Sequence, residues 1–134
     1  MHLFPVDETH PAAAVQSAAR VLASGNTQVW FPEGWRSPDG KLQRFQSGIG
    51  QLLLQSGAPA VPVWISGAFE ALPRGRRIPR LRQVTVDFGL PGAPQELARE
   101  GTGGNDDVRI AHALRIRLVC LARSRGHRVE DTAS

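Results

Sequence analysis

Val29-Trp30-Phe31-Pro32-Glu33-Gly34-Trp35-Arg36-Ser37 is the stretch that decides how the rest of the chain is interpreted. Four of the five residues from Thr27 to Phe31 are β-branched or aromatic, which is typical of a half-buried strand. Pro32 cannot donate a hydrogen bond to a β-ladder, and Gly34 lets the backbone turn sharply. The sequence therefore predicts a strand over 27–31 that ends in a loop at the edge of a sheet.

The loop carries an acid, Glu33, and a guanidinium, Arg36, three residues apart. Active groups favour loops held by a rigid scaffold, and the planar fork of arginine matches a phosphate in two-point geometry. An exposed ion pair in a turn is the other interpretation, since such pairs are common and weak. The residues of this loop alone leave both interpretations open.

Further blocks follow in a fixed order. After Phe31-Pro32-Glu33-Gly34-Trp35-Arg36-Ser37 come Pro38-Asp39-Gly40, then Phe45 and Gly48, and then Val61-Pro62-Val63-Trp64-Ile65-Ser66-Gly67. Together they resemble the phospholipid/glycerol acyltransferase family, of the lysophosphatidate acyltransferase type. The resemblance implies an α/β fold with a mixed, largely parallel sheet and flanking helices. It also implies transfer of a fatty acyl group from acyl-CoA or acyl carrier protein to a hydroxyl of a lysophospholipid or glycerol phosphate, with no bound cofactor and no metal.

The resemblance also assigns substrate-binding residues. They are Glu33, Gly34, Trp35, Arg36, Ser37, Gly48 and Pro62. Arg36 is the first choice for the phosphate contact, while Trp35 departs from the threonine common at that place in the family. For Gly48 close packing of a helix on the sheet is an equal alternative, and for Pro62 a purely structural strand is.

The catalytic base of the family is an H-x-x-x-x-D pair, because a hydroxyl must lose its proton to attack an acyl group. His2 and Asp7 have this spacing, but Leu3 to Asp7 resembles a different family block, an apolar strand ending in an acid. We therefore treat the spacing as coincidental and assign no catalytic residue. No acid stands five residues after His10, His112 or His127. The expectation is the carboxy-terminal portion of a longer acyltransferase. The alternatives are a truncated product, a degenerate paralogue, a non-catalytic fragment that binds anionic lipid, or one half of a split acyltransferase.

The whole chain is predicted to divide into four parts. Residues 1–94 are predicted to form the acyltransferase-like core, 95–104 a flexible linker, 105–125 an amphipathic helix and 126–134 a tail. Within the core, a strand over 3–7 and a helix over 11–23 precede the strand over 27–31, an order typical of a crossover between parallel strands. Further elements are predicted as a helix over 49–55 and strands over 60–66 and 83–88.

Charge and composition limit the kinds of partner that are expected. The formal net charge is +4, and Lys41 is the only lysine among 16 basic residues. Arg74 to Arg82 holds five arginines in nine positions and is predicted to be a loop, either against an anionic membrane surface or solvated. Nucleic acid is not expected as a partner, because this loop lacks interleaved aromatic residues.

Localisation follows from the same features. No apolar stretch approaches the roughly 20 residues of a spanning helix, and the sequence after Met1 is not typical of a signal peptide. We expect a cytoplasmic protein that is peripheral at the inner face of the membrane. Cys120 stands alone in an apolar run, which permits no internal disulfide and predicts a core position.

Overall fold

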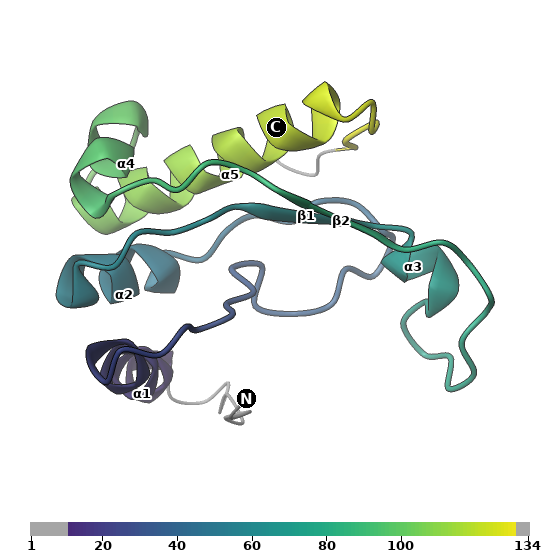
Figure 1. Ribbon diagram of the computed structural model, residues 1–134, viewed down its shortest axis with the longest axis horizontal. Helices are drawn as coiled ribbons and strands as arrows, with labels where there is room; N and C mark the ends of the chain where they lie inside the picture. The colour runs from purple at the N-terminus through teal and green to yellow at the C-terminus, as the bar shows by residue number, and fades with distance from the viewer. Residues whose placement is uncertain (1–10, 131–134) are drawn as a thin grey trace.

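The computed structural model describes residues 11–130. Its elements are α1 (Pro11–Ala23), α2 (Gly48–Ser56), β1 (Val63–Ser66), α3 (Ala68–Ala71), β2 (Thr85–Phe88), α4 (Pro94–Glu100) and α5 (Asp106–Ser124). Helices α1, α2 and α4 gather at one end of the molecule, and α5 runs from there along the two strands (Figure 1). Helix α3 and the loop after it lie at the opposite end.

The hydrophobic core lies among the helices. Leu52, Leu97 and Ile110, from α2, α4 and α5, have at most 2% of their surface exposed. Val15 and Ala18 of α1 close the same cluster from the other side of α2. The helices predicted over 11–23 and 49–55 are therefore confirmed, and their apolar positions face one another as helical spacing requires.

The sheet is smaller than expected. Strands β1 and β2 pair antiparallel, with Ile65 opposite Val86. Residues 27–31 make no β-ladder with any part of the chain that is described: Trp30 packs against the core, while Val29 and Phe31 are more than half exposed. The mixed α/β class is confirmed, but parallel pairing is not seen within residues 11–130. The partner strand expected at residues 3–7 lies outside the described residues.

The segment 95–104 was expected to be a flexible linker, and this is wrong for its first half, because α4 occupies it. Pro94 stands in the first turn, where its missing N–H costs nothing, and the Glu96 carboxylate accepts from the backbone N–H of Ala93 at 3.4 Å. Leu97 is fully buried. Only Gly101 to Gly104 connects α4 to α5 without regular structure.

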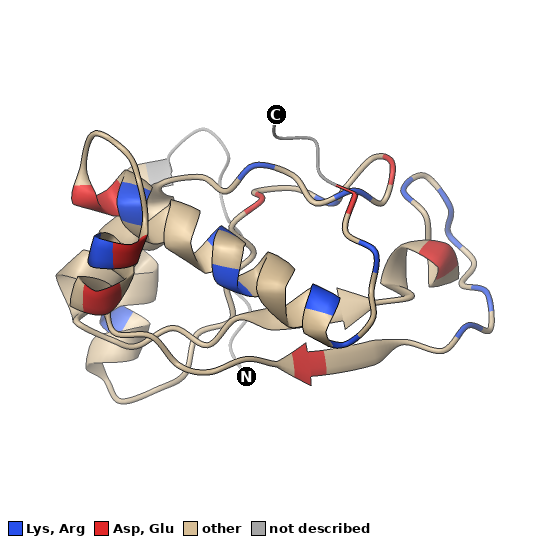
Figure 2. Cartoon of the chain, turned by 90° about the horizontal axis from the view of Figure 1, so that it is seen from above, with Lys and Arg blue, Asp and Glu red and all other residues tan. Residues whose placement is uncertain are grey.

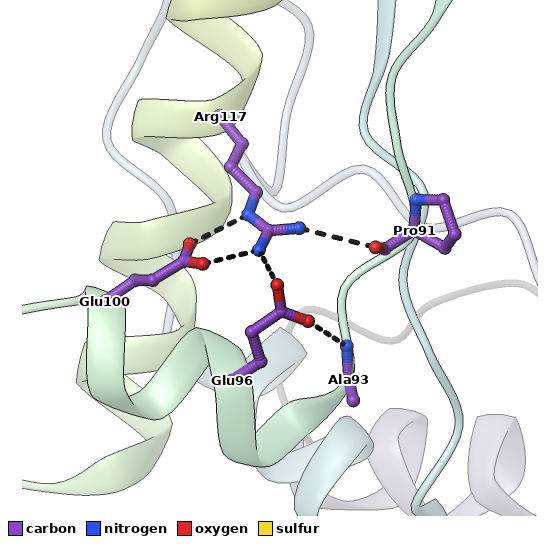
Figure 3. Close-up of polar contacts among 5 residues, drawn as sticks. All are labelled: Pro91, Ala93, Glu96, Glu100 and Arg117. Carbon is purple, nitrogen blue, oxygen red and sulfur yellow. Dashed lines mark hydrogen bonds and ion pairs between the residues drawn. The ribbon is translucent and has the colours of Figure 1, made fainter.

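A charged network fixes α4 to α5 (Figure 3). The Arg117 guanidinium donates to both carboxylate oxygens of Glu100, at 2.8 and 2.6 Å, and to Glu96 at 2.6 Å. A further donor reaches the Pro91 carbonyl at 3.4 Å. The two carboxylates raise the pKa of Arg117, and the hydrogen bond from Arg117 lowers the pKa of Glu100. Arg117 is thus a structural bridge between α4 and α5.

Helix α5 corresponds to the amphipathic helix predicted over 105–125, and it packs its apolar stripe on the rest of the domain. Ala111, Leu114 and Leu118 are buried, and α5 touches α2, α4 and both strands. Cys120 is exposed, so the core position predicted for it is wrong; it lies on the side of α5 turned away from the stripe. No helix within residues 11–130 is long and apolar enough to cross a membrane.

The tail predicted over 126–134 is ordered as far as the structure describes it. Residues 127–130 turn back along α5, and the Glu130 carbonyl accepts from the backbone N–H of Leu42 at 3.1 Å. Lys41 pairs with the Glu130 carboxylate at 3.5 Å. This return brings the end of the described chain beside the loop that follows the Glu33 block.

Candidate functional site

The loop from Phe31 to Ser37 is anchored on one side by Glu33. Its carboxylate accepts from the backbone N–H of Gln43 at 2.7 Å, while Arg115 of α5 donates to the Gln43 carbonyl at 3.3 Å. Burial raises the pKa of the half-buried Glu33 carboxyl, an effect opposed by the Gln43 N–H and by the charge of Arg115. Glu33 therefore ties the loop to the segment 41–43 and, through it, to α5.

The other side of the loop is anchored by Arg36 and Trp35. The Arg36 Nη2 donates to the Leu72 carbonyl at 2.5 Å, at the end of α3. The Arg74 guanidinium lies 5.3 Å from the centre of the Trp35 ring, within range of a cation–π contact. The side chains of Arg36 and Trp35 are both exposed. The sequence motif is thus joined to a segment 36 residues further along the chain.

Ser37 begins a tight turn. Its hydroxyl donates to the Lys41 carbonyl at 2.9 Å and to the Asp39 carboxylate at 3.1 Å, and Asp39 also accepts from the Lys41 N–H. These hydrogen bonds, that of the Lys41 N–H first, lower the pKa of Asp39. Gly40 has φ +80° and lies against the Phe69 ring, so this turn rests on α3.

Gly34 has φ +78°, in the left-handed region that favours glycine, which confirms the sharp turn expected there. Gly48 is different: a Cβ there would meet Val15 and Trp30 at 3.7 and 3.8 Å, which is ordinary contact. The close approach is at Gly50, where a Cβ would lie 2.1 Å from the Asp107 carbonyl oxygen. The close packing that was considered for Gly48 is thus made by Gly50, two residues further along α2.

Pro62 lies apart from the motif loop. It is buried, and with Phe88, Leu90 and Leu121 it lines an open groove of about 700 Å³ beside α5. None of residues 33–37 lines that groove. The structure therefore brings Glu33 to Ser37 together in one loop but does not bring Pro62 to them.

One histidine–acid pair escaped the sequence analysis. The His127 Nε2 lies 3.3 Å from the Asp87 carboxylate of β2, and Arg125 lies 3.6 Å from the other Asp87 oxygen. The His127 ring is 6.2 Å from the Trp64 ring, whose Nε1 is buried without a hydrogen-bond partner. A search limited to an acid five residues after each histidine could not find a pair separated by 40 residues. His2 and Asp7 lie outside the described residues.

Metal-binding clusters were sought among the described side chains. Within residues 11–130, no three His, Cys, Asp or Glu side chains come close enough to hold a metal ion.

Comparison with known proteins decides the family. A family model described as Acyltransferase matches residues 1–66. The 1-acyl-sn-glycerol-3-phosphate acyltransferase of Limnanthes alba is 40% identical over 94 residues, which are 67% of this chain and 34% of that protein. The crystal structure of the 1-acyl-sn-glycerophosphate acyltransferase of Thermotoga maritima matches with a TM-score of 0.68 at 26% identity. The chain belongs to the acyltransferase family.

Its coverage of these acyltransferases is partial. The match with the Thermotoga maritima structure covers 87% of this chain and 46% of that one, and the match with the Cocos nucifera 1-acyl-sn-glycerol-3-phosphate acyltransferase, 31% identical, covers 81% and 36%. The chain therefore spans about a third of the length of the curated acyltransferases it matches. The family match includes the Glu33 block and Pro62, so the family resemblance stated from the sequence is confirmed.

Proposed function

We propose that this chain forms the acceptor-binding part of an enzyme of phospholipid biosynthesis or remodelling. That enzyme transfers a fatty acyl group from acyl-CoA or acyl carrier protein to a hydroxyl of a lysophospholipid or glycerol phosphate. The names of the matched acyltransferases support this acceptor class. The structural observation that carries the proposal is the exposed Arg36 guanidinium, held at one nitrogen by the Leu72 carbonyl.

The fork of Arg36 explains why a phosphate fits. Among the described residues only its Nη2 has a protein acceptor, and Nη2 carries two hydrogens, so its second N–H together with Nε or Nη1 leaves one two-point fork for an oxyanion. The bond to Leu72 fixes the direction of the fork before the acceptor arrives. Trp35 and Ser37 flank it in the loop, and the Glu33 carboxylate is turned inward to Gln43, so it does not repel the incoming phosphate directly.

The reaction also needs a base. The acceptor hydroxyl loses its proton as its oxygen attacks the thioester carbonyl, and the sulfur of the donor leaves as a thiol. We infer that an H-x-x-x-x-D pair outside this sequence supplies the base, and that the enzyme works as a peripheral protein at the cytoplasmic face of the membrane. The assigned substrate-binding residues remain Glu33, Gly34, Trp35, Arg36, Ser37, Gly48 and Pro62.

The role of Arg36 is tested in an active protein that contains this chain. We expect Arg36→Ala to lower kcat/KM for lysophosphatidate by roughly 10-fold to 150-fold, about 1.5 to 3 kcal/mol. A monoacylglycerol acceptor, which has no phosphate, should be used equally well by both proteins. Arg123→Ala is the matched control, because Arg123 is exposed and its side chain has no hydrogen-bond or ion-pair partner within residues 11–130. Equal kcat/KM for lysophosphatidate in Arg36→Ala and wild type would remove Arg36 from the acceptor site.

A second candidate, a non-catalytic half that binds anionic lipid, is favoured because neither histidine within residues 11–130, His112 or His127, has a carboxylate to itself. The only histidine–acid pair within residues 11–130 is His127 with Asp87, and there the carboxylate is shared with Arg125. Incubation of the purified 134-residue chain with acyl-CoA and lysophosphatidate tests this candidate. We expect no thiol release. Release that is abolished by His127→Ala would place a base within this chain and exclude the non-catalytic candidate.

A further inference from the structure

The loop of residues 73–84, between α3 and β2, concentrates positive charge at one end of the molecule (Figure 2). It holds Arg74, Arg76, Arg77, Arg80 and Arg82 and no acidic residue. Every side chain from residue 74 to residue 84 is exposed. Within residues 11–130, no carboxylate pairs with any of the five guanidinium groups. By contrast, Arg109, Arg117 and Arg125 outside the loop each pair with a carboxylate.

The same loop exposes large aliphatic side chains. Ile78 is 80% exposed and Leu81 is completely exposed. They alternate with the arginines in the order Arg77-Ile78-Pro79-Arg80-Leu81-Arg82. A loop that is simply solvated does not need exposed aliphatic side chains. A loop that binds an acidic protein would need only the positive charges. Aliphatic side chains interleaved with arginines fit the boundary of a bilayer, where acyl chains and phosphates lie a few ångströms apart.

Hydrogen bonds give the loop a defined shape at its base. The backbone N–H of Arg80 donates to the Ala71 carbonyl at 2.7 Å, and that of Arg76 to the Pro73 carbonyl at 3.1 Å. The Arg80 bond closes residues 72–79 into a projecting segment. Since its two ends are held together, the arginines of the loop are presented at the same end of the molecule (Figure 2).

We propose that the loop 73–84 docks on an anionic lipid bilayer, with Ile78 and Leu81 entering the interface and the five arginines contacting lipid phosphates. Trp35 lies under Arg74, and Arg36 is bonded to Leu72 at the root of the loop. Docking therefore places the acceptor-binding loop at the surface from which a lysophospholipid would come. This consequence rests on the proposed function, but docking itself is measured without acyl transfer.

Binding of the 134-residue chain to vesicles tests the proposal. We expect co-sedimentation with vesicles of phosphatidylcholine and phosphatidylglycerol, weakened by high salt, and little with pure phosphatidylcholine. Arg76→Gln with Arg77→Gln should lower the partition coefficient roughly 30-fold. Arg99→Gln with Arg123→Gln removes the same charge from exposed positions on α4 and α5 and should lower it much less. Equal losses in the two double variants would overturn the assignment to this loop.

The aliphatic contribution has its own control. Leu81→Ser should lower binding by roughly 10-fold or more, because it removes a side chain that enters the interface. Leu90→Ser changes a side chain that is 82% exposed beyond the far end of β2 and should leave binding unchanged. Circular dichroism confirms that both variants fold. Binding unaffected by Leu81→Ser would show that the arginines act without insertion and would refute docking as stated.

Depth is measured by quenching with brominated acyl chains. Trp35 is 57% exposed next to the loop, whereas Trp30 packs on the core and Trp64 is half-buried on β1. We expect brominated anionic vesicles to quench the emission of the wild-type chain, and Trp35→Phe to lose most of that quenching while still co-sedimenting. Binding to acyl carrier protein without binding to vesicles, or vesicle binding without quenching of Trp35, would contradict the proposal.

Discussion

Substitution of Gly50 by alanine should break the packing of α2 against α5. A Cβ at this position would lie 2.1 Å from the Asp107 carbonyl oxygen, 2.5 Å from its Cα and 2.6 Å from its carbonyl carbon. All three are backbone atoms in the first turn of α5, so no side-chain rotation can relieve the clash. To reach ordinary contact near 3.4 Å the helices must separate by about 1.3 Å.

The cost follows from two opposing effects. Alanine within a helix is more favourable than glycine by about 0.8 to 1 kcal/mol. Overpacking costs about 1 to 3 kcal/mol and reaches the upper end where backbone must move, as it must here beside the fully buried Ile110. We expect Gly50→Ala to lower the free energy of unfolding by about 2 kcal/mol, which corresponds to a fall in Tm of roughly 6 to 10 °C for a chain of this size.

Gly48→Ala is the matched control, because it adds the same methyl group to the same helix where only ordinary contacts await it. Its free energy of unfolding should equal that of the wild type or exceed it slightly. Urea denaturation followed by far-UV circular dichroism measures both variants. If Gly50→Ala proves as stable as Gly48→Ala, the close approach of α2 to α5 does not exist in solution and the predicted clash is refuted.

Two further predictions concern charge. Arg117→Met should lower the free energy of unfolding at pH 7 by about 1 to 2 kcal/mol, since Glu96 and Glu100 lose their shared partner. The lowered pKa of Glu100 gives stability that is present above its unfolded pKa and is lost as the pH falls through its folded pKa. The deficit of Arg117→Met should therefore shrink between pH 7 and pH 3 in urea titrations, and a constant deficit would contradict the network. For Glu33 the sign is opposite: its raised pKa means that the stability contribution is complete below the unfolded pKa and is lost as the pH rises through the folded pKa. Glu33→Gln keeps an oxygen acceptor for the Gln43 N–H and should gain stability relative to wild type from pH 4 to pH 7, whereas a relative loss over that range would show that the ionised form is the favoured one.

Local patterns in the sequence were sufficient for three of the helices and for one turn. Spacing of apolar residues predicted α1, α2 and α5, and glycine placed the sharp turn at Gly34. Helix α4 was missed because Gly101 to Gly104 dominated the interpretation of its neighbourhood. The signals were present, since Pro94 and Glu96 have the spacing of a helix start, but seven residues are too few to show a helical period.

Contacts between distant segments could not be predicted. The sequence drew attention to Gly48, yet the backbone that makes a glycine necessary belongs to Asp107, 57 residues beyond Gly50. The pair of His127 and Asp87 and the bond from Arg36 to the Leu72 carbonyl have the same character. The residue types give no signal for such pairs, because only the fold brings the two members of each pair together.

The acceptor-binding loop is held between two parts of the molecule with different tasks. Glu33 ties it, through Gln43 and Arg115, to the helical core, while Arg36 and Trp35 tie it to the basic loop 73–84. Because no side chain from residue 74 to residue 84 is buried, changes there should alter lipid binding without changing the unfolding midpoint. Leu81→Ser and Gly50→Ala should thus have opposite profiles, the first losing vesicle binding at full stability and the second losing stability with vesicle binding intact below its melting temperature. If both variants lost both properties, the loop and the core would be one cooperative unit, and the separation of docking from folding would be refuted.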